Sequence, residues 1–583
     1  MKIRFERFLK TLANVFGKTP SAGSYVFILL IALWSATALN IPFYDYVADN
    51  FSIRSLKALV FVCTLPFFFF AVSLLIVNLL FLPYIGKAIF ALLTIISAVA
   101  GYYMMTFGIL IDADMIQNVF ETSKREAFDL ITFPFAIRVM FLGVIPAILI
   151  LVFKVKFLPL KYELILRGVF FISSLIIIGF SALVSFRSYA DFRKEHKEQL
   201  PKIITPINYV YHTAKYIQRI RLLNKELHIL DADAKFNGER NVSQEHKVLV
   251  IMIGETSRAA NFQLGGYDRE TNPKLTALSD LVYFKNTSSC ATATGVSVPC
   301  MFSYFERKNF DITDAKFTEN IIDLANKTGY KVIWKNNNDD CKGVCDRVMA
   351  GGGIINVKEL NFSADYCDKD YCFDGIFLRD FADELKAVDR DTIFVFHTIG
   401  SHGPKYYKRY PDKFRVFKPT CDTAQIHDCD RESLINTYDN TIYYADFVIE
   451  SVIDALDDAQ NLQSALIYAS DHGESLGEAA SFYKRQIAAS IKGQASSSKS
   501  SGIYLHGMPY TIAPEEQIKV PMLLWLDNDF LNAEKIDLNC LQTNAKTGEF
   551  SHDFLFHSLL TLLDIETKLY KSELDFIAPC KKR

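Results

Sequence analysis

A short segment between two cysteines holds the residues of this chain that are best suited to nucleophilic chemistry. It reads Cys290-Ala-Thr-Ala-Thr-Gly-Val-Ser-Val-Pro-Cys300, so two threonines and a serine lie in a loop that a disulfide would close. A free alkyl hydroxyl is a weak nucleophile at neutral pH and needs a metal ion or a base to activate it. The spacing does not choose between Thr292 and Thr294, and the segment is a candidate site only if the rest of the chain supplies that partner.

Candidate partners directly follow apolar runs that have the length and composition of buried β-strands. Because the carboxyl ends of parallel strands meet at one edge of a sheet, we expect the side chains after these runs to converge. A mixed set of carboxylates and imidazoles suits Zn²⁺ better than Mg²⁺, with Mn²⁺ as an alternative. The candidates are Glu255, His397, His402, Asp471 and His472.

The C-terminal half of the chain, from Lys247 onward, has the pattern of an α/β domain. Short apolar runs alternate with helix-like segments, and strands separated by helices predict a mainly parallel sheet. The apolar runs are Val248–Ile253, Val332–Trp334, Ile393–His397, Ala465–Ala469 and Val520–Leu526, and the helix-like segments include Glu319–Thr328 and Ser433–Asp457.

The first third of the chain is strongly apolar and predicts a transmembrane domain of five helices over residues 1–187. Each apolar run approaches the roughly 20 residues that a helix needs to cross the hydrocarbon core. Buried helices of a soluble protein would explain one such run, but not five in succession. The runs are Tyr25–Phe43, Leu59–Leu82, Ala88–Ile111, Phe135–Phe153 and Gly168–Val184.

Basic residues before the first run and between the fourth and fifth predict that both regions are cytoplasmic. With five spans, everything after about Arg187 then lies outside the cytoplasm. Residues 188–246 read as a linker whose amphipathic stretch Tyr209–Leu223 follows the membrane surface. The 63 basic and 65 acidic residues provide no electrostatic argument for binding nucleic acid.

The cysteines agree with a location in an oxidising compartment. Of the eleven, only Cys63 lies in a predicted span, and the other ten follow residue 289. The simplest interpretation pairs these ten in chain order as five disulfides. A zinc cluster at the CxxxC of Cys341 and Cys345 is the weaker alternative, since no second CxxC or histidine pair lies nearby. The expected pairs are Cys290–Cys300, Cys341–Cys345, Cys367–Cys372, Cys421–Cys429 and Cys540–Cys580.

Several phrases of the chain resemble the bacterial phosphoethanolamine transferases, the family that includes lipid A-modifying and mobile colistin-resistance enzymes. The resemblance covers nearly the whole chain, including the five spans. Ala291 stands where the family usually has glycine, and Gly295 where alanine is common. The phrases are Gly254–Arg258, Thr292–Ser303, Trp334–Asn338, Ser470–Glu478 and Tyr504–Pro509.

This resemblance implies an alkaline-phosphatase/sulfatase-like α/β/α domain over residues 247–583, on the periplasmic side of the bacterial inner membrane. It also chooses Thr294 over Thr292 as the nucleophile and implies that Glu255, Asp471 and His472 hold zinc together with the Thr294 oxygen. Zinc lowers the pKa of a bound hydroxyl, which would let Thr294 attack without a strong adjacent base.

Further residues match family positions that contact the phosphoryl group or the lipid headgroup, while His397 matches none with a firm role. Asn118, Thr122 and Glu126 recur every four residues, so they share one face if their segment is helical. A solvated amphipathic helix is the alternative to a headgroup site. The remaining matches are Lys342, His402 and His506.

The resemblance implies transfer of phosphoethanolamine from phosphatidylethanolamine, through Thr294, to an envelope acceptor, most simply lipid A. Core oligosaccharide, periplasmic glucan or a protein are alternative acceptors. A phosphoglycerol transferase of the lipoteichoic-acid-synthase type is a rival activity that the many cysteines disfavour. A sulfatase is disfavoured because its motif Cys-x-Pro-x-Arg is absent. A non-catalytic receptor is disfavoured because it would not need this set of residues.

Residues 479–502 form an insertion that is either a surface loop or, through its basic part, a membrane contact.

Overall fold

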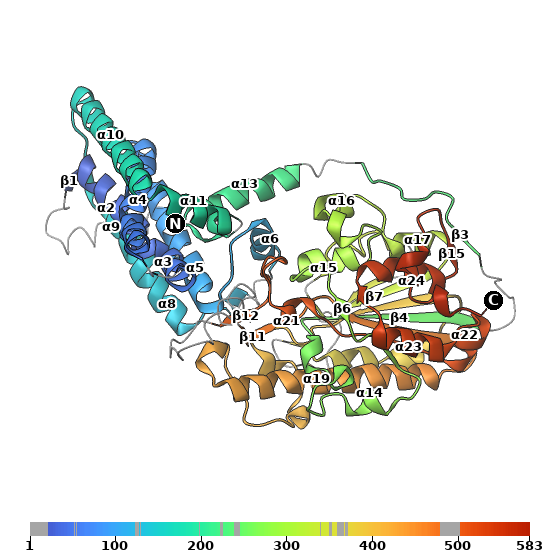
Figure 1. Cartoon of the computed structure of the whole chain (residues 1–583). Helices are drawn as coiled ribbons and strands as arrows, with labels where there is room; N and C mark the ends of the chain where they lie inside the picture. The colour runs from blue at the N-terminus through green and yellow to red at the C-terminus, as the bar shows by residue number, and fades with distance from the viewer. Residues whose placement is uncertain are drawn as a thin grey trace, which may run out of the picture. The chain divides into compact units, whose positions relative to one another are not determined.

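The computed structural model describes residues 21–582 except 52, 54, 123–126, 129, 198, 222–225, 238–244, 339, 349–352, 358–365, 368–370 and 479–501. Glu126 and nearly all of the 479–502 insertion therefore lie outside the described residues. The chain forms two compact units (Figure 1), one of Met1–Ile116 with Ile131–Lys215, the other of Gln117–Leu130 with Tyr216–Arg583. The segment that holds Asn118 and Thr122 thus groups with the second unit.

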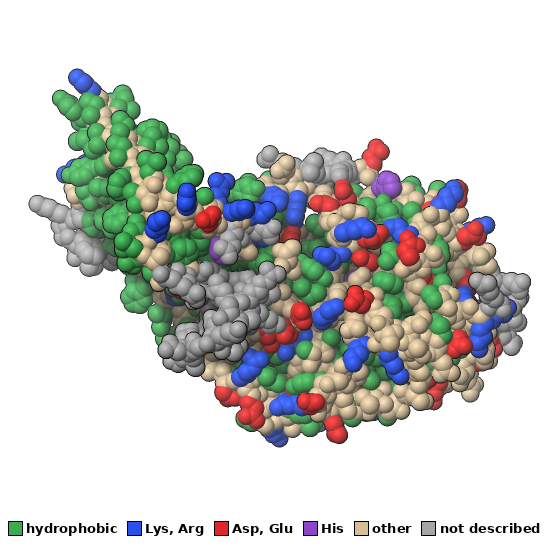
Figure 2. Space-filling view, in the orientation of Figure 1, with side chains coloured by type: hydrophobic (Ala, Val, Ile, Leu, Met, Phe, Trp, Pro, Cys, Tyr) green, Lys and Arg blue, Asp and Glu red, His purple; other side chains and the backbone are tan. Residues whose placement is uncertain are grey.

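Among the described residues of the first unit, five helical segments are long and apolar enough to cross a membrane, which confirms the predicted number. Large apolar side chains cover much of their surface, as Figure 2 shows. The segments are α2 (Ser24–Ala36) continued by η1 (Ala38–Asn40) and α3 (Ile41–Asn50); α4 (Leu56–Leu80); α5 (Gly86–Phe107); α8 (Phe133–Val139), η2 (Met140–Val144) and α9 (Ile145–Val152); and α10 (Leu160–Val184).

The fifth segment begins at Leu160, earlier than the Gly168 expected from hydropathy, and so includes Lys161 and the charged pair Glu163 and Arg167. Glu163 Oε1 lies 3.1 Å from Arg167 Nε, and Ser24 donates to Glu163 Oε2 at 2.7 Å. Arg167 also donates to the carbonyls of Asn78 and Phe81 at 2.6 and 2.7 Å. Because these charges are paired within the unit, they extend the helix instead of ending it.

Shorter helices follow the last span. They include α11 (Phe186–Glu195), α12 (Leu200–Ile203) and α13 (Ile207–Arg221), the last of which corresponds to the amphipathic stretch predicted at Tyr209–Leu223. Exposed apolar residues of α13 include Ile207, Val210, Ile217 and Ile220, as expected for an amphipathic helix.

The second unit is built around a seven-stranded sheet of order β5-β13-β10-β4-β9-β7-β8. The five strands from β10 to β8 are mutually parallel, which confirms the predicted α/β class, whereas β13 is antiparallel to β10. Their bounds are β5 Val282–Tyr283, β13 Met522–Leu526, β10 Leu462–Ser470, β4 His246–Gly254, β9 Thr392–His397, β7 Lys331–Asn336 and β8 Gly353–Asn356.

Helices cover both faces of this sheet (Figure 1), with α15, α17 and α24 on one face and the long α19 on the other. The central strands are therefore buried on both faces and read as continuous apolar runs. The helices are α14 (Pro273–Ala277), α15 (Thr294–Met301), α16 (Ile312–Lys316), α17 (Ile321–Lys327), α18 (Phe381–Lys386), α19 (Arg431–Asp457), α21 (Glu515–Ile518), α22 (Asn528–Ala533), α23 (Leu538–Thr547) and α24 (Asp553–Leu562).

Short two-stranded pairs complete the two units. They are β1 (Ser21–Gly23) with β2 (Lys154–Lys156), β3 (Lys235–Phe236) with β15 (Ile565–Glu566), β6 (Thr287–Ser288) with β14 (Phe550–Ser551), and β11 (Ser475–Glu478) with β12 (Ile503–Leu505). The pair β6 and β14 lies next to the cysteine-bracketed segment and joins it to the start of α24.

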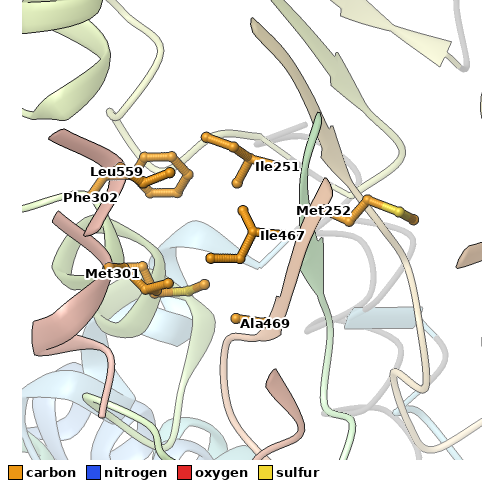
Figure 3. A pocket seen from close by; sticks show the side chains of 8 residues that line it. Ile251, Met252, Met301, Phe302, Ile467, Ala469 and Leu559 are labelled. Carbon is orange, nitrogen blue, oxygen red and sulfur yellow. The ribbon is translucent and has the colours of Figure 1, made fainter. Parts of the chain in front are cut away.

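A small apolar cavity lies between the sheet and the helices α15 and α24 (Figure 3). Its volume is about 10 Å³, which is the least that a single water molecule needs. It is therefore a packing defect of the core and not a place for substrate. Its lining includes Ile251, Met301, Phe302, Ile467 and Leu559.

The cysteines pair as predicted. The five disulfides join Cys290–Cys300, Cys341–Cys345, Cys367–Cys372, Cys421–Cys429 and Cys540–Cys580, and Cys63 is an exposed free thiol. The bond between Cys341 and Cys345 rules out the alternative of a zinc cluster at that pair, because a disulfide sulfur is not a thiolate ligand.

Candidate active site

Two neighbouring parallel strands and one helix position the candidate metal ligands and the threonine. Glu255 follows β4, while Asp471 and His472 follow β10, and the two strands are in register up to Gly254 and Ser470. Thr294 is the first residue of α15.

The four side chains come together. Thr294 Oγ1 lies 3.1 and 3.2 Å from the two carboxylate oxygens of Glu255 and 3.2 Å from His472 Nε2. Ligand atoms of Glu255, Asp471 and His472 all lie within 4.8 Å of one another, and the three residues are fully buried.

The orientation of His472 and Asp471 fits a bound cation. His472 Nδ1 donates to the Gly473 carbonyl at 2.8 Å, so Nε2 carries the lone pair that faces the other ligands. Asp471 Oδ1 accepts from the backbone N–H groups of Thr256 and His472, whereas buried Oδ2 has no hydrogen bond and lies 3.4 Å from His472 Nε2. Electron-rich atoms that converge without donors repel one another unless a positive ion lies between them.

Burial shifts the pKa values of His472 and Asp471 in opposite directions, and only the shift of His472 favours metal binding. It lowers the pKa of His472 well below its usual value, which keeps the imidazole in the neutral form that binds metals. Burial also raises the pKa of Asp471 to about 6, because loss of water around the carboxylate disfavours its charged form.

A residue to which sequence reasoning assigned no role orients Glu255. Asn338 donates to Glu255 Oε2 at 2.8 Å and to the Thr398 carbonyl at 3.1 Å, which joins the ends of β7 and β9 to the site. Gly400 passes close behind Glu255 with a φ of +46°, and a Cβ at this position would lie only 2.5 Å from the Glu255 carbonyl oxygen. The phrase Trp334–Asn338 at a strand end was the available signal for Asn338.

The two threonines of the segment have different partners. Thr292 is buried and donates to the Met508 carbonyl at 2.5 Å, while its own carbonyl accepts from Gly507 at 2.7 Å. Thr292 thus connects the segment to residues Tyr504–Pro509. The hydroxyl of Thr294 instead faces Glu255 and His472 of the candidate metal site. The geometry separates two residues that spacing alone left equivalent.

Comparisons with known proteins find family matches in both units of the chain. The profile described as "Phosphoethanolamine transferase EptA/EptB" matches residues 69–220, and the Sulfatase profile matches residues 247–565. Phosphoethanolamine transferase EptA of Escherichia coli K12 is 37% identical over 567 residues, covering 97% of this chain and 98% of the relative. The chain belongs to the phosphoethanolamine transferases.

Two further relatives support this assignment. Phosphatidylethanolamine transferase Mcr-1 of Escherichia coli is 31% identical over 564 residues, covering 96% of this chain and 98% of the relative. The integral membrane lipooligosaccharide phosphoethanolamine transferase A of Neisseria meningitidis has 35% sequence identity and a TM-score of 0.89, covering 97% and 100% of the two chains. The resemblance noted in the sequence and the predicted fold are therefore confirmed.

Three histidines of the transferase were expected near the site, and the structure separates their positions. The ring of His506 lies 4.4 Å from that of the candidate ligand His472 and 5.5 Å from that of His402. His506 Nδ1 lies 3.5 Å from buried Glu474. His397, also expected to converge with the metal ligands, packs instead against the Trp334 ring at 6.2 Å and is not a member of the group.

Lys342 of the transferase lies in the loop after β7, inside the turn closed by the Cys341–Cys345 disulfide. Its φ is +53°, a left-handed conformation that favours glycine, and its Nζ lies 3.3 Å from Asp340 Oδ1. Only 8% of its side chain is exposed, so little of its surface faces water.

The end of α6 (Ala113–Glu121) brings polar side chains to the first turn of α15. A Cβ added to Gly295 would lie 2.8 Å from Glu121 Oε2 and 3.5 Å from Asn118 Oδ1. Glu121 Oε1 also accepts from Lys316 Nζ at 3.2 Å. Thr122 instead donates to the Asn118 carbonyl at 2.5 Å. Sequence reasoning included Asn118 and Thr122 and missed Glu121, which lies on the same short helix.

Proposed function

We propose that this transferase moves phosphoethanolamine from phosphatidylethanolamine to a phosphate of lipid A, through a covalent intermediate on Thr294 at a zinc site. The observation that carries the proposal is the placement of Thr294 Oγ1 within 3.2 Å of both Glu255 and His472. The names of two relatives support the donor and the acceptor, since one is a phosphatidylethanolamine transferase and another acts on lipooligosaccharide. The enzyme then lies in the bacterial inner membrane with its second unit in the periplasm.

In the first step, Thr294 Oγ attacks the donor phosphorus and the bond to the diacylglycerol oxygen breaks. The proton lost by Thr294 ends on that leaving oxygen, and phosphoethanolamine remains on the enzyme. Zinc held by Glu255, Asp471 and His472 would lower the pKa of a hydroxyl bound to it. In the second step, a protonated oxygen of the acceptor phosphate attacks the same phosphorus and the bond between phosphorus and Thr294 Oγ breaks. The proton of the acceptor oxygen ends on Thr294 Oγ.

Other residues act on the phosphoryl group and the headgroup in this proposal. Lys342, His402 and His506 stabilise the negative charge that develops on the phosphoryl oxygens. Asn118, Thr122 and Glu126 contact the lipid headgroup. The N-terminus of α15 also favours a phosphate beside Thr294, because its first backbone N–H groups point away from the helix.

Analysis of lipid A from cells that express the chain tests the proposed acceptor. We expect mass spectrometry to show lipid A with one added phosphoethanolamine, and no addition in cells that express Thr294→Ala at the same level. Modified core sugar or glucan with unmodified lipid A would contradict the acceptor. Release of diacylglycerol from phosphatidylglycerol but not from phosphatidylethanolamine would contradict the donor and favour the phosphoglycerol alternative.

The carboxylate of Glu121 is a further contact for the ethanolamine ammonium in this proposal. Its Oε1 already binds the alkylammonium of Lys316, while Oε2 faces Gly295 beside the nucleophile. We expect Glu121→Gln to lower kcat/KM for phosphatidylethanolamine by about 10- to 100-fold, the usual effect of losing a hydrogen bond to a charge. Hydrolysis of a phosphoester that lacks ammonium should change little.

The control for this prediction is Lys316→Gln, which leaves the Glu121 carboxylate in place. Turnover of phosphatidylethanolamine should persist in that variant. Equal losses for both donors in Glu121→Gln would show a general disturbance of the site and contradict a role in ammonium binding.

A further inference from the structure

His552 joins the nucleophile segment to the strand that carries the metal ligands. It lies directly before α24, and its side chain is 1% exposed. The Cys290 backbone N–H donates to its Nδ1 at 3.1 Å, and its Nε2 lies 3.0 Å from the Ser470 carbonyl oxygen. Cys290 begins the loop that leads to Thr294, and Ser470 directly precedes Asp471.

Both partners of the imidazole belong to the main chain, which determines its tautomer. A backbone N–H can only donate, so His552 Nδ1 is the acceptor. A carbonyl oxygen can only accept, so Nε2 carries the hydrogen and donates to Ser470. Burial lowers the pKa of His552 to about 4, and the ring is neutral at physiological pH.

A hydroxyl adds a second connection between the same elements. Ser297, one helical turn after Thr294 on α15, donates to the Asp471 carbonyl at 2.5 Å, and its oxygen also lies 3.4 Å from His552 Nδ1. The His552 backbone N–H donates to the Ser288 carbonyl at 3.1 Å, beside the pairing of β6 with β14. The backbone of His552 is therefore anchored to β6, while its ring bridges Cys290 and Ser470.

We propose that His552 is a positioning residue of the transfer reaction, whose imidazole sets the spacing between Thr294 and the metal-binding pair Asp471 and His472. This inference rests on the proposed function. The physical reason is that Thr294 and Asp471 come from segments far apart in the chain, and displacement of a reacting group by about 1 Å can cost about 100-fold in rate. Because both ring nitrogens are engaged by the main chain, His552 moves no proton in the reaction.

The test compares three substitutions in the full-length, zinc-loaded enzyme. His552→Ala removes both bonds, His552→Asn keeps an acceptor near the position of Nδ1, and His552→Gln keeps a donor near that of Nε2. We expect His552→Ala to lower kcat by about 10- to 100-fold with little change in KM, as for other groups that support a metal site. Asn and Gln should each recover part of that loss, and the shape of the pH profile of kcat should not change.

His557 provides a matched control on the same helix. It is equally buried, and its Nδ1 accepts from the backbone N–H of Lys571 at 3.3 Å. We expect His557→Ala to lower the melting temperature while the folded enzyme keeps its kcat.

Three results would overturn the positioning role. The first is full kcat in folded His552→Ala. The second is a loss of kcat that follows the loss of thermal stability across the three His552 variants, since a purely structural role would also give that result. The third is loss of one limb of the pH profile, which would indicate acid or base catalysis. Failure of the proposed function is distinguishable, because wild-type enzyme incubated with phosphatidylethanolamine would then form no adduct on Thr294.

Discussion

We expect Thr294→Ala to lose nearly all phosphoethanolamine transfer while the fold stays intact. Thr294 donates to Glu255 and lies beside His472, so its replacement removes the hydroxyl proposed as nucleophile and only one methyl group of a half-buried side chain. We expect transfer to fall by at least about 10³-fold, the scale seen when a covalent nucleophile is removed. Zinc binding should weaken without being lost, because the three other ligands remain.

The measurement is mass spectrometry of the enzyme after incubation with phosphatidylethanolamine. Wild-type enzyme should carry phosphoethanolamine on the peptide that contains Thr294, and Thr294→Ser should form the same adduct more slowly. Thr292→Ser is the matched control within the segment, since it keeps the hydroxyl that binds Met508. An adduct on another residue of the Thr294→Ala variant would show that the nucleophile is assigned wrongly.

Asp471→Asn is expected to have the second large effect, through the metal. The substitution keeps the shape of the side chain and its contacts with the backbone on Oδ1, but removes the charge that Oδ2 brings to the site. We expect zinc affinity to fall by at least about 100-fold and transfer to fall with it. Chelation should have the same effect on wild-type enzyme, and added zinc should reverse it.

Thermal unfolding distinguishes a lost metal ligand from a damaged fold. Zinc that binds only the folded state raises the melting temperature of wild-type enzyme, and this increase should be much smaller in Asp471→Asn. Without metal, the variant should be at least as stable as wild type, because it removes repulsion among buried electron-rich groups. Asp346→Asn is the control, since this exposed aspartate lies beside the disulfide-bonded Cys341 and Cys345. Unchanged zinc content in Asp471→Asn would contradict the ligand assignment.

Much of the fold was predictable because its signals are local. A membrane span requires only a long apolar run, and five such runs correspond to the five segments. The strands β4, β9 and β10 were visible because a strand buried on both faces is continuously apolar. Boundaries were less predictable where charges are paired inside the protein, as with Glu163 and Arg167 at the start of α10.

The sequence by itself determined the transmembrane helices, the α/β class, the order of the disulfides and a short set of candidate ligands, because each depends on neighbours in the chain. Only the tertiary structure gave Thr292 and Thr294 different partners, removed His397 from the candidate ligands, and added Asn338, Glu121 and His552. These assignments depend on contacts between residues as much as 262 positions apart, such as Cys290 with His552. No local pattern encodes a contact of that kind, since packing of the sheet and its helices creates it.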